Sequence, residues 1–192
     1  MSALRAGIAG YGLAGEVFHA PLIDAVDGME VAGVVTTDPE RQQRARDRYP
    51  SARVVPDIEA LWDGIDVLVI ATPNRAHVPL GLRAVDHGVP MVMDKPLAPT
   101  ADDGERLILA AEEAGVGLTV FQNRRFDGDF LTLQGILDRG ELGTVTRFES
   151  RFERYRPSVD GGGWRELGDP AEGGGLLLDL GAHLADQARV LF

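Results

Sequence analysis

Short apolar segments without polar alternation recur along the first 121 residues, and stretches with helical spacing separate them. Continuous apolar runs of this kind are typical of strands that are covered on both faces of a sheet. The apolar runs lie at residues 4–9, 31–35, 54–55, 67–71, 90–93 and 118–121, and the helical patterns lie at residues 14–26, 58–62, 77–87 and 101–114. This alternation predicts an α/β fold, a doubly wound parallel sheet of the Rossmann type.

The pattern changes after residue 123. A helical pattern at residues 129–139 is followed by one alternating segment at residues 145–155, which predicts an antiparallel strand. A glycine-rich stretch and a last helical pattern at residues 174–190 follow. One strand and two helices cannot close a core, so we expect one domain at residues 1–123 and the opening of a second, incomplete domain at residues 124–192.

Charge and composition exclude several classes of partner. With 30 acidic and 19 basic side chains the net charge is -11, which disfavours nucleic acid. The absence of cysteine excludes disulfides, thiolate catalysis and cysteine-based zinc sites, and we predict no metal site. Because no apolar run reaches about 18 residues and no export leader follows Met1, we expect no membrane partner and a cytoplasmic location.

Lys95 is the only lysine among the 19 basic residues. A bias towards arginine explains the other 18 but not this exception. A lysine offers a compact ammonium that can exchange its proton, which arginine does not. Lys95 is therefore either a chance exception or a residue kept for its chemistry.

A glycine-rich hexapeptide separates the first strand from the first helix. Gly10-Tyr11-Gly12-Leu13-Ala14-Gly15 matches the pattern G-x-G-x-x-G. In that position the first glycine permits a tight turn, the second lets the backbone approach a pyrophosphate, and the third lets helix and strand pack closely. The hexapeptide in this setting predicts that the first domain binds NAD or NADP.

The end of the second strand leaves the choice between these two cofactors open. Thr36 and Thr37 stand where an acidic residue would bind the ribose hydroxyls of NAD. Asp38 could fill that role, or it could cap the helix that begins with Pro39. Arg41 could meet the 2′-phosphate of NADP or could simply be a solvated helix side chain, so the sequence favours NADP only slightly.

Two further polar strings follow strands of the predicted sheet, and ligands of such sheets bind beyond the carboxyl ends of the strands. Ala71-Thr72-Pro73-Asn74 follows the fourth strand, with His77 at the start of the next helix, and Asp94-Lys95-Pro96 follows the fifth. Local packing is the simpler interpretation of His77.

Asp179 and His183 are four residues apart in the last helical pattern. On an α-helix they would share one face, one turn apart. A carboxylate so placed can hold an imidazole and support its protonated form, as a general base requires. The alternative is a polar helix face with an incidental pair.

Together these strings resemble the Gfo/Idh/MocA oxidoreductase family over the whole chain. Strings that resemble its NADP-dependent scyllo-inositol 2-dehydrogenase branch are Phe18-His19-Ala20-Pro21-Leu22, Asn123-Arg124-Arg125-Phe126-Asp127, Tyr155-Arg156-Pro157 and Trp164-Arg165-Glu166. The resemblance implies a hydride transfer between NADP or NAD and a secondary alcohol of a cyclitol, polyol or sugar. It implies Lys95, Asp179 and His183 as the catalytic group.

The resemblance also implies a cofactor site and an assembly. The predicted cofactor contacts are Gly10, Tyr11, Gly12, Leu13, Ala14, Gly15, Thr36, Thr37, Asp38, Arg41, Ala71, Thr72, Pro73, Asn74, His77, Asp94, Lys95 and Asn123. In the full-length form we expect a homo-oligomer, a dimer or tetramer. Two alternatives remain, a truncated or non-catalytic dinucleotide-binding module and a sugar–sugar oxidoreductase with tightly bound NADP.

The chain departs from the family in two respects. The similar branch has a basic residue where this chain has Asp38, which puts NADP preference in doubt. Family members are also much longer, and their second domain is an α+β domain with an open, largely antiparallel sheet. The chain therefore looks truncated at its C-terminal side, with only the start of that domain.

Overall fold

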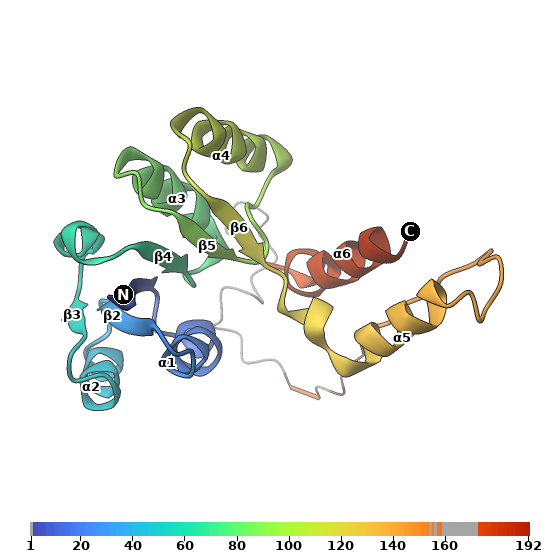
Figure 1. The fold of residues 1–192 in the computed structure, drawn as a ribbon, viewed down its shortest axis with the longest axis horizontal. Coiled ribbons are helices and arrows are strands. Elements are labelled where there is room, and N and C mark those ends of the chain that lie inside the picture. Colours follow the sequence, from blue (N-terminus) through green and yellow to red (C-terminus); the bar gives the residue numbers. More distant parts are fainter. Residues whose placement is uncertain (1, 154, 156, 159–172) are drawn as a thin grey trace. The chain divides into compact units, whose positions relative to one another are not determined.

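The computed structural model describes residues 2–153, 155, 157–158 and 173–192. The chain divides into two compact units, Met1–Val120 and Phe121–Phe192 (Figure 1). The division lies close to the boundary that we predict at residue 123. Each unit is described here by itself.

The first unit is built on one six-stranded sheet. Its strands are β1 (Leu4–Ala9), β2 (Met29–Val35), β3 (Arg53–Val55), β4 (Val67–Ile70), β5 (Met91–Asp94) and β6 (Leu118–Phe121). They lie in the order β3-β2-β1-β4-β5-β6, and the pairs from β3 to β5 are parallel. This is the Rossmann order, so the predicted fold class is confirmed.

Helices and helical turns connect the strands. They are the π-helical turn η1 (Ala14–His19), α1 (Ala20–Asp24), α2 (Pro39–Arg48), the 3-10 turns η2 (Ile58–Ala60), η3 (Trp62–Gly64) and η4 (Asn74–Ala76), α3 (His77–Asp86) and α4 (Ala101–Ala114). The prediction of one helix at residues 58–62 is wrong. Two 3-10 turns replace it because Ile58, Leu61 and Trp62 all enter the core, and a spacing of about three residues per turn brings them there together.

Buried side chains cover the sheet on both faces. On β4, Leu68 and Ile70 join the core under α3 and α4, whereas Val69 joins the core under α1 and α2 (Figure 1). Each fully buried aliphatic side chain contributes roughly 1.5–3 kcal/mol. The double cover explains why these strands show no polar alternation.

Capping residues mark the start of α2 and both ends of α4. The Asp38 carboxylate accepts from the backbone of Glu40 at 2.9 Å and of Arg41 at 3.1 Å. Thr100 Oγ1 accepts from the backbone of Asp103, and Gly115 ends α4 in the left-handed conformation at φ +65°. Each cap satisfies backbone groups that the helix itself leaves open.

An ion pair between Arg5 and Asp66 links the start of β1 to the residue before β4. This ion pair should make the free energy of unfolding depend on pH. Arg5 donates to the Asp66 carboxylate from its backbone at 2.8 Å and from its guanidinium at 2.8 and 3.2 Å. These bonds, the guanidinium bond above all, lower the pKa of Asp66 to about 2. The ionised Asp66 carboxylate stabilises the fold fully above roughly pH 4, the pKa of an aspartate in the unfolded chain. This stabilisation is lost as the pH falls towards 2.

Urea unfolding of the wild type and of Asp66→Asn tests this expectation. The wild type should be the more stable protein at pH 7, and the difference should shrink steadily below about pH 4. A difference that persists unchanged at lower pH would show that Asp66 acts through packing and not through its charge.

The second unit contains four described helical segments. They are the 3-10 turn η5 (Asn123–Phe126), α5 (Gly128–Asp138), the π-helical turn η7 (Leu177–Gly181) and α6 (Ala182–Leu191). The predicted strand at residues 145–155 is not formed: residues 145–153 and 155 have no strand structure, and residue 154 lies outside the described part. A strand needs a hydrogen-bonded neighbour, and the rest of the described second unit offers none beyond the last residue of β6.

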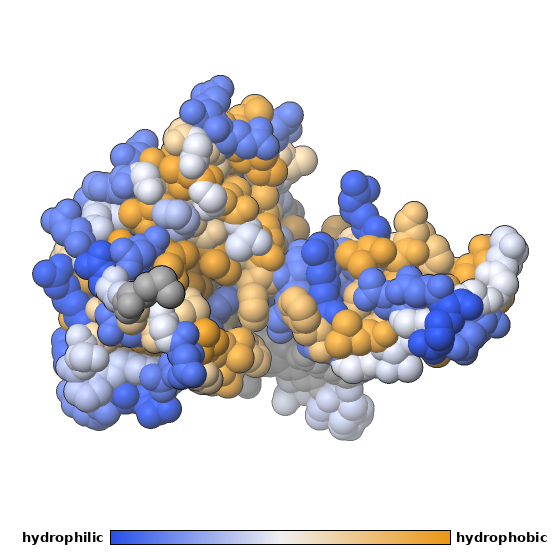
Figure 2. Space-filling model, in the orientation of Figure 1, coloured by the Kyte–Doolittle hydropathy of each residue, from blue (hydrophilic) through white to orange (hydrophobic). Residues whose placement is uncertain are grey.

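Large apolar side chains remain exposed in this unit. They include Phe126, Leu142, Leu176, Leu177 and Phe192, each more than half exposed, and apolar surface is plain in this part of Figure 2. Exposed apolar surface of this kind is typical of a face that meets another protein surface. Within the described residues, no helix has the length and apolar character needed to cross a bilayer.

Candidate functional site

The loop after β1 lies against the loop after β4, where the strand order of the sheet reverses. Gly10 has a φ of +94°, and a Cβ atom there would stand 2.5 Å from the carbonyl oxygen of Ala71. Only glycine fits both the conformation and the close approach. The two loops therefore meet at the edge of the sheet where Rossmann folds bind ligands.

The other two glycines of the loop differ in what they contact. A Cβ atom at Gly15 would stand 2.0 Å from the carbonyl oxygen of Gly10, so the helix packs directly on the turn. A Cβ atom at Gly12 would find only the Arg41 guanidinium, with Nη1 3.6 Å away. The fold itself requires Gly10 and Gly15, whereas Gly12 leaves an open space at the start of the helix.

Polar groups of the loop after β4 face inward. Thr72 Oγ1 is buried and has no hydrogen-bond partner within the described residues, and Asn74 is 3% exposed. A buried hydroxyl without a partner costs free energy unless a ligand satisfies it. The Thr72 hydroxyl lacks a hydrogen-bond partner among the described residues, and its contact with a cofactor stays a prediction.

His77 joins two loops from inside the protein. Its side chain is fully buried, with Nδ1 2.8 Å from the Pro96 carbonyl oxygen and Nε2 3.0 Å from that of Thr72. Burial lowers the pKa of His77, although both carbonyl contacts raise it. We predicted His77 as a cofactor contact, but its burial leaves no surface for direct contact, so it holds the loops that follow β4 and β5 together.

Asp94 and Lys95 lie where β5 ends, and a histidine that the sequence did not indicate as a site residue lies beside Asp94. His19, at the end of η1, is 4% exposed, and its Nε2 is 3.8 Å from Asp94 Oδ2. The Lys95 backbone donates to Asp94 Oδ1 at 3.2 Å. In the sequence, His19 is a single histidine between Phe18 and Ala20, four residues after the glycine loop.

At the end of β2, Asp38 is engaged by its own helix. Besides its capping bonds, it pairs with Arg41, whose Nε lies 3.3 Å from Asp38 Oδ2, and the capping bonds from Arg41 and Glu40 lower the pKa of Asp38. Thr36 is 8% exposed, its hydroxyl lies 3.4 Å from the Asp38 backbone nitrogen, and Thr37 is exposed. Of the two interpretations of Asp38, the helix cap is confirmed.

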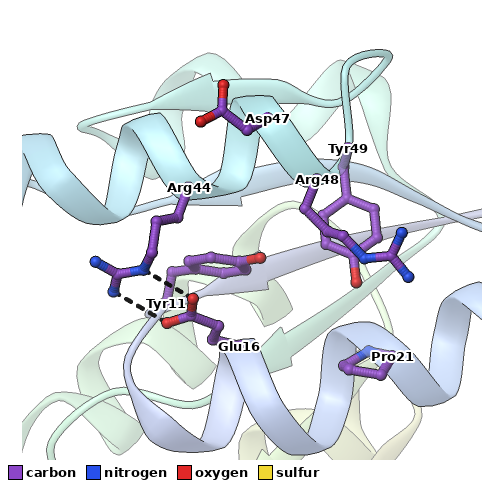
Figure 3. Close-up of a pocket in the computed structure, with 7 residues that line it drawn as sticks. All are labelled: Tyr11, Glu16, Pro21, Arg44, Asp47, Arg48 and Tyr49. Atoms are coloured by element: carbon purple, nitrogen blue, oxygen red, sulfur yellow. Dashed lines mark hydrogen bonds and ion pairs between the residues drawn. The ribbon is translucent and has the colours of Figure 1, made fainter.

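A cavity of about 450 Å³ lies between η1, α1 and α2, behind the glycine loop. Figure 3 shows Arg44 of α2 paired with Glu16 of η1, at 2.8 and 3.0 Å. Tyr11 lies in its wall, and burial raises the pKa of Tyr11 to about 12. The Tyr11 side chain is 2% exposed and belongs to the core, so only its backbone can serve the cofactor site that we predict.

Asp179 and His183 lie in the second unit, on either side of a change in helix type. Asp179 is in the π-helical turn η7, where the Ala182 backbone donates to the Leu177 carbonyl five residues back, and His183 is in α6 with 6% exposure. The two residues therefore do not have the regular α-helical spacing that we predicted.

Other predicted residues of this unit are placed only in part. Asn123 begins η5, which is tied to α6 because Arg125 pairs with Asp186 at 2.7 and 2.5 Å and Gln187 donates to the Arg124 carbonyl. The strings around Arg156 and Trp164-Arg165-Glu166 lie outside the described residues.

Comparison with known proteins gives matches for both units. Residues 4–122 match the oxidoreductase family with an NAD-binding Rossmann fold, and residues 130–192 match the GFO/IDH/MocA C-terminal domain. Uncharacterized oxidoreductase YdgJ of Escherichia coli is 43% identical over 98% of this chain and 54% of its own length. The scyllo-inositol 2-dehydrogenase (NADP(+)) IolW of Bacillus subtilis is 38% identical over 98% of this chain and 52% of its own length.

Solved structures agree with these matches. YPO2259 from Yersinia pestis has a TM-score of 0.87 and 44% identity, and it covers all of this chain with 53% of its own. The structure of yvaA from Bacillus subtilis has a TM-score of 0.89 and 35% identity, with the same coverage. The chain thus spans about half the length of the relatives that it matches, and it belongs to the Gfo/Idh/MocA oxidoreductase family.

Proposed function

We propose that the protein containing this chain is an NAD(P)-dependent dehydrogenase that acts on a secondary alcohol of a cyclitol, polyol or sugar. The open space at Gly12 carries the proposal, because the neighbouring glycines are needed by the fold and this one is not. The buried hydroxyl of Thr72 supports it from the facing loop. Two relatives with dehydrogenase names, IolW and inositol 2-dehydrogenase 4 of Saccharopolyspora erythraea, favour a cyclitol.

The proposed roles divide between the two units. A bound nicotinamide would supply the hydride acceptor. His183 would take the proton of the substrate hydroxyl, and Asp179 would orient the imidazole and support its protonated form. Lys95 would hydrogen-bond the same oxygen and stabilise the charge that develops there.

We further propose that the cofactor is NADP. Asp38 has one oxygen occupied by two backbone N–H groups and the other beside Arg41, so little of it remains for a ribose diol. Arg41 directs Nη1 towards the space over Gly12 while its Nε faces Asp38. A half-exposed guanidinium held in this way suits a phosphate on the adenosine ribose.

Fluorescence titration with NADPH and NADH tests both proposals. The wild type should bind NADPH more tightly, and Arg41→Ala should weaken NADPH by about 10-fold or more while leaving NADH nearly unchanged, since a hydrogen bond to a charged group contributes about 1.5–3 kcal/mol. Arg46→Ala is the matched control, because Arg46 lies on the same helix and its guanidinium donates to Gln42 Oε1.

Two outcomes would count against the proposals separately. An equal loss for both dinucleotides in Arg41→Ala would place Arg41 on the shared diphosphate and remove the argument for NADP. Failure of the wild type to bind either dinucleotide would contradict the dehydrogenase itself. Cofactor that stays bound through gel filtration would instead favour the sugar–sugar oxidoreductase.

We also propose that the full protein is a homo-oligomer. The exposed apolar side chains of the second unit support an association surface. Light scattering across a range of protein concentrations would measure the molar mass, and hence the number of subunits in the oligomer.

A further inference from the structure

His77 presents both of its ring nitrogens to groups that can only accept a hydrogen bond. Its Nδ1 lies 2.8 Å from the Pro96 carbonyl oxygen, and its Nε2 lies 3.0 Å from the Thr72 carbonyl oxygen. A carbonyl oxygen never donates, and a neutral imidazole has only one N–H group. The neutral ring can therefore form one of these two hydrogen bonds, and only the doubly protonated ring can form both.

Burial makes this shortage of protons costly. The His77 side chain is 0% exposed, so solvent cannot replace a missing bond at either nitrogen. In the neutral ring, the lone pair of one nitrogen faces a carbonyl oxygen at hydrogen-bond distance, and that oxygen receives no proton from the ring. The protonation state of His77 thus decides whether its side chain holds one loop or two.

The two contacts of the ring are not equivalent. Pro96 lies 19 positions after His77, in the loop that follows β5, and its contact is the shorter of the two. Thr72 lies five positions before His77, in the loop that follows β4, and the turn η4 connects the two residues. The shorter distance favours Nδ1 as the site of the single proton. The Thr72 carbonyl then has no donor from His77 until the ring takes up a second proton.

The surroundings of His77 set the pH range in which this happens. Burial, the largest influence, lowers the pKa of His77, and Lys95 lowers it further, whereas the two carbonyl contacts and Asp94 raise it. Both of these charged residues lie where β5 ends, and Arg75, the charged residue of η4, is exposed. Because the net shift is downward, the ring is neutral at about pH 7 and takes up its second proton in mildly acidic solution.

We propose that His77 is a positioning residue with two states: with one proton, on Nδ1, it holds the loop after β5, and with a second proton, on Nε2, it also holds the loop after β4. That second loop carries the buried Thr72 hydroxyl, which we predict as a cofactor contact. A loop that is fixed before the cofactor arrives loses less entropy on binding. Only this last step rests on the proposed function, since the ring contacts do not depend on it.

Nitrogen-15 NMR of the imidazole rings tests the two states directly. The chain has four histidines, and the His77 resonances are those that disappear in His77→Gln. If that variant does not fold, His19→Gln, His87→Gln and His183→Gln assign the other three rings and leave His77 by elimination. Between about pH 8 and pH 5, a neutral ring protonated on Nδ1 should become a ring protonated on both nitrogens, and its Nε2 proton should exchange slowly with solvent.

Three NMR results would overturn the proposal. They are a neutral ring protonated on Nε2, a ring that is already charged at about pH 8, and a ring that stays neutral until the protein unfolds.

Fluorescence titration with NADPH tests the positioning role. The affinity of the wild type divided by that of His77→Gln should rise by about threefold or more as the ring gains its second proton, the effect of about one net hydrogen bond. Taking this ratio at each pH removes the titration of NADPH itself. A glutamine is polar but cannot become charged, so a purely structural role of His77 would give the same ratio at every pH and would overturn the proposal.

A matched control and a separate outcome complete the test. His87→Gln should bind NADPH as the wild type does at every pH, since His87 is exposed and stacks on Trp62 with ring centroids 4.4 Å apart. Failure to bind NADPH at any pH, together with the expected NMR change at His77, would contradict the dehydrogenase and leave the two states of the ring standing.

Discussion

Replacing Gly12 by alanine should strongly weaken dinucleotide binding while leaving the stability of the protein unchanged. The new Cβ atom would lie at an ordinary contact distance, 3.6 Å, from the flexible Arg41 side chain, so the fold has room for it. A pyrophosphate that approaches the backbone at Gly12 has no such room. We expect a loss of affinity of about 100-fold, the equivalent of one or two charged hydrogen bonds, measured by NADPH fluorescence beside a thermal melt.

Two glycines of the same unit are the controls. Gly15→Ala should lower both affinity and melting temperature, because its Cβ atom would overlap the carbonyl of Gly10. Gly64→Ala should lower neither, since nothing lies within 4 Å of its Cβ position. Normal NADPH affinity in Gly12→Ala would remove the main support for the proposed function.

Turnover should fall by about 10²- to 10⁴-fold in Lys95→Ala and in His183→Ala, and NADPH affinity should stay nearly unchanged in His183→Ala. Each residue is proposed to act on the substrate oxygen, and a general acid or base typically contributes a factor of this size. Turnover would be followed by nicotinamide absorbance with inositols and aldoses as substrates. Because the chain spans about half the length of its relatives, the assay should use a protein that includes the rest of the second domain.

The same turnover assay should include Asp179→Asn, which tests the partner of His183, and His87→Ala as a control. Asp179→Asn should reduce turnover less than His183→Ala, because an amide can still hold the ring but no longer supports its positive charge. His87→Ala should have no effect on turnover. Wild-type rates in Lys95→Ala or His183→Ala would contradict the catalytic assignment even if NADPH binds well.

The parallel sheet could be predicted from the sequence because burial on both faces removes polar alternation from its strands. Leu68, Val69 and Ile70 show this, since neighbouring residues enter opposite cores. The glycine loop could be predicted for a similar reason, because Gly10 and Gly15 face backbone atoms that no side chain could avoid. In both cases a local constraint limits which residue types can occupy the position, so the sequence alone indicates the structure.

Other features depend on tertiary contacts between residues that are distant in the sequence, and the local sequence pattern does not indicate such contacts. The alternating segment at residues 145–155 has the period of a strand, but the described second unit offers no further strand to pair with it. Tyr11 sits inside a cofactor motif, yet its ring belongs to the core between α1 and α2. The contact between His19 and Asp94 could not be predicted, because the two residues lie 75 positions apart in the sequence.

The wide turn η1 has a consequence for transferring this arrangement to another protein. A π-helical turn holds one residue more than an α-helical turn, and one residue corresponds to about 100° of rotation around the helix axis. A segment shortened by one residue between Gly15 and His19 could keep the sheet and the glycine loop, yet it would swing the imidazole away from β5. Grafting the motif onto a different scaffold would thus require copying the spacing after the loop as faithfully as the loop itself.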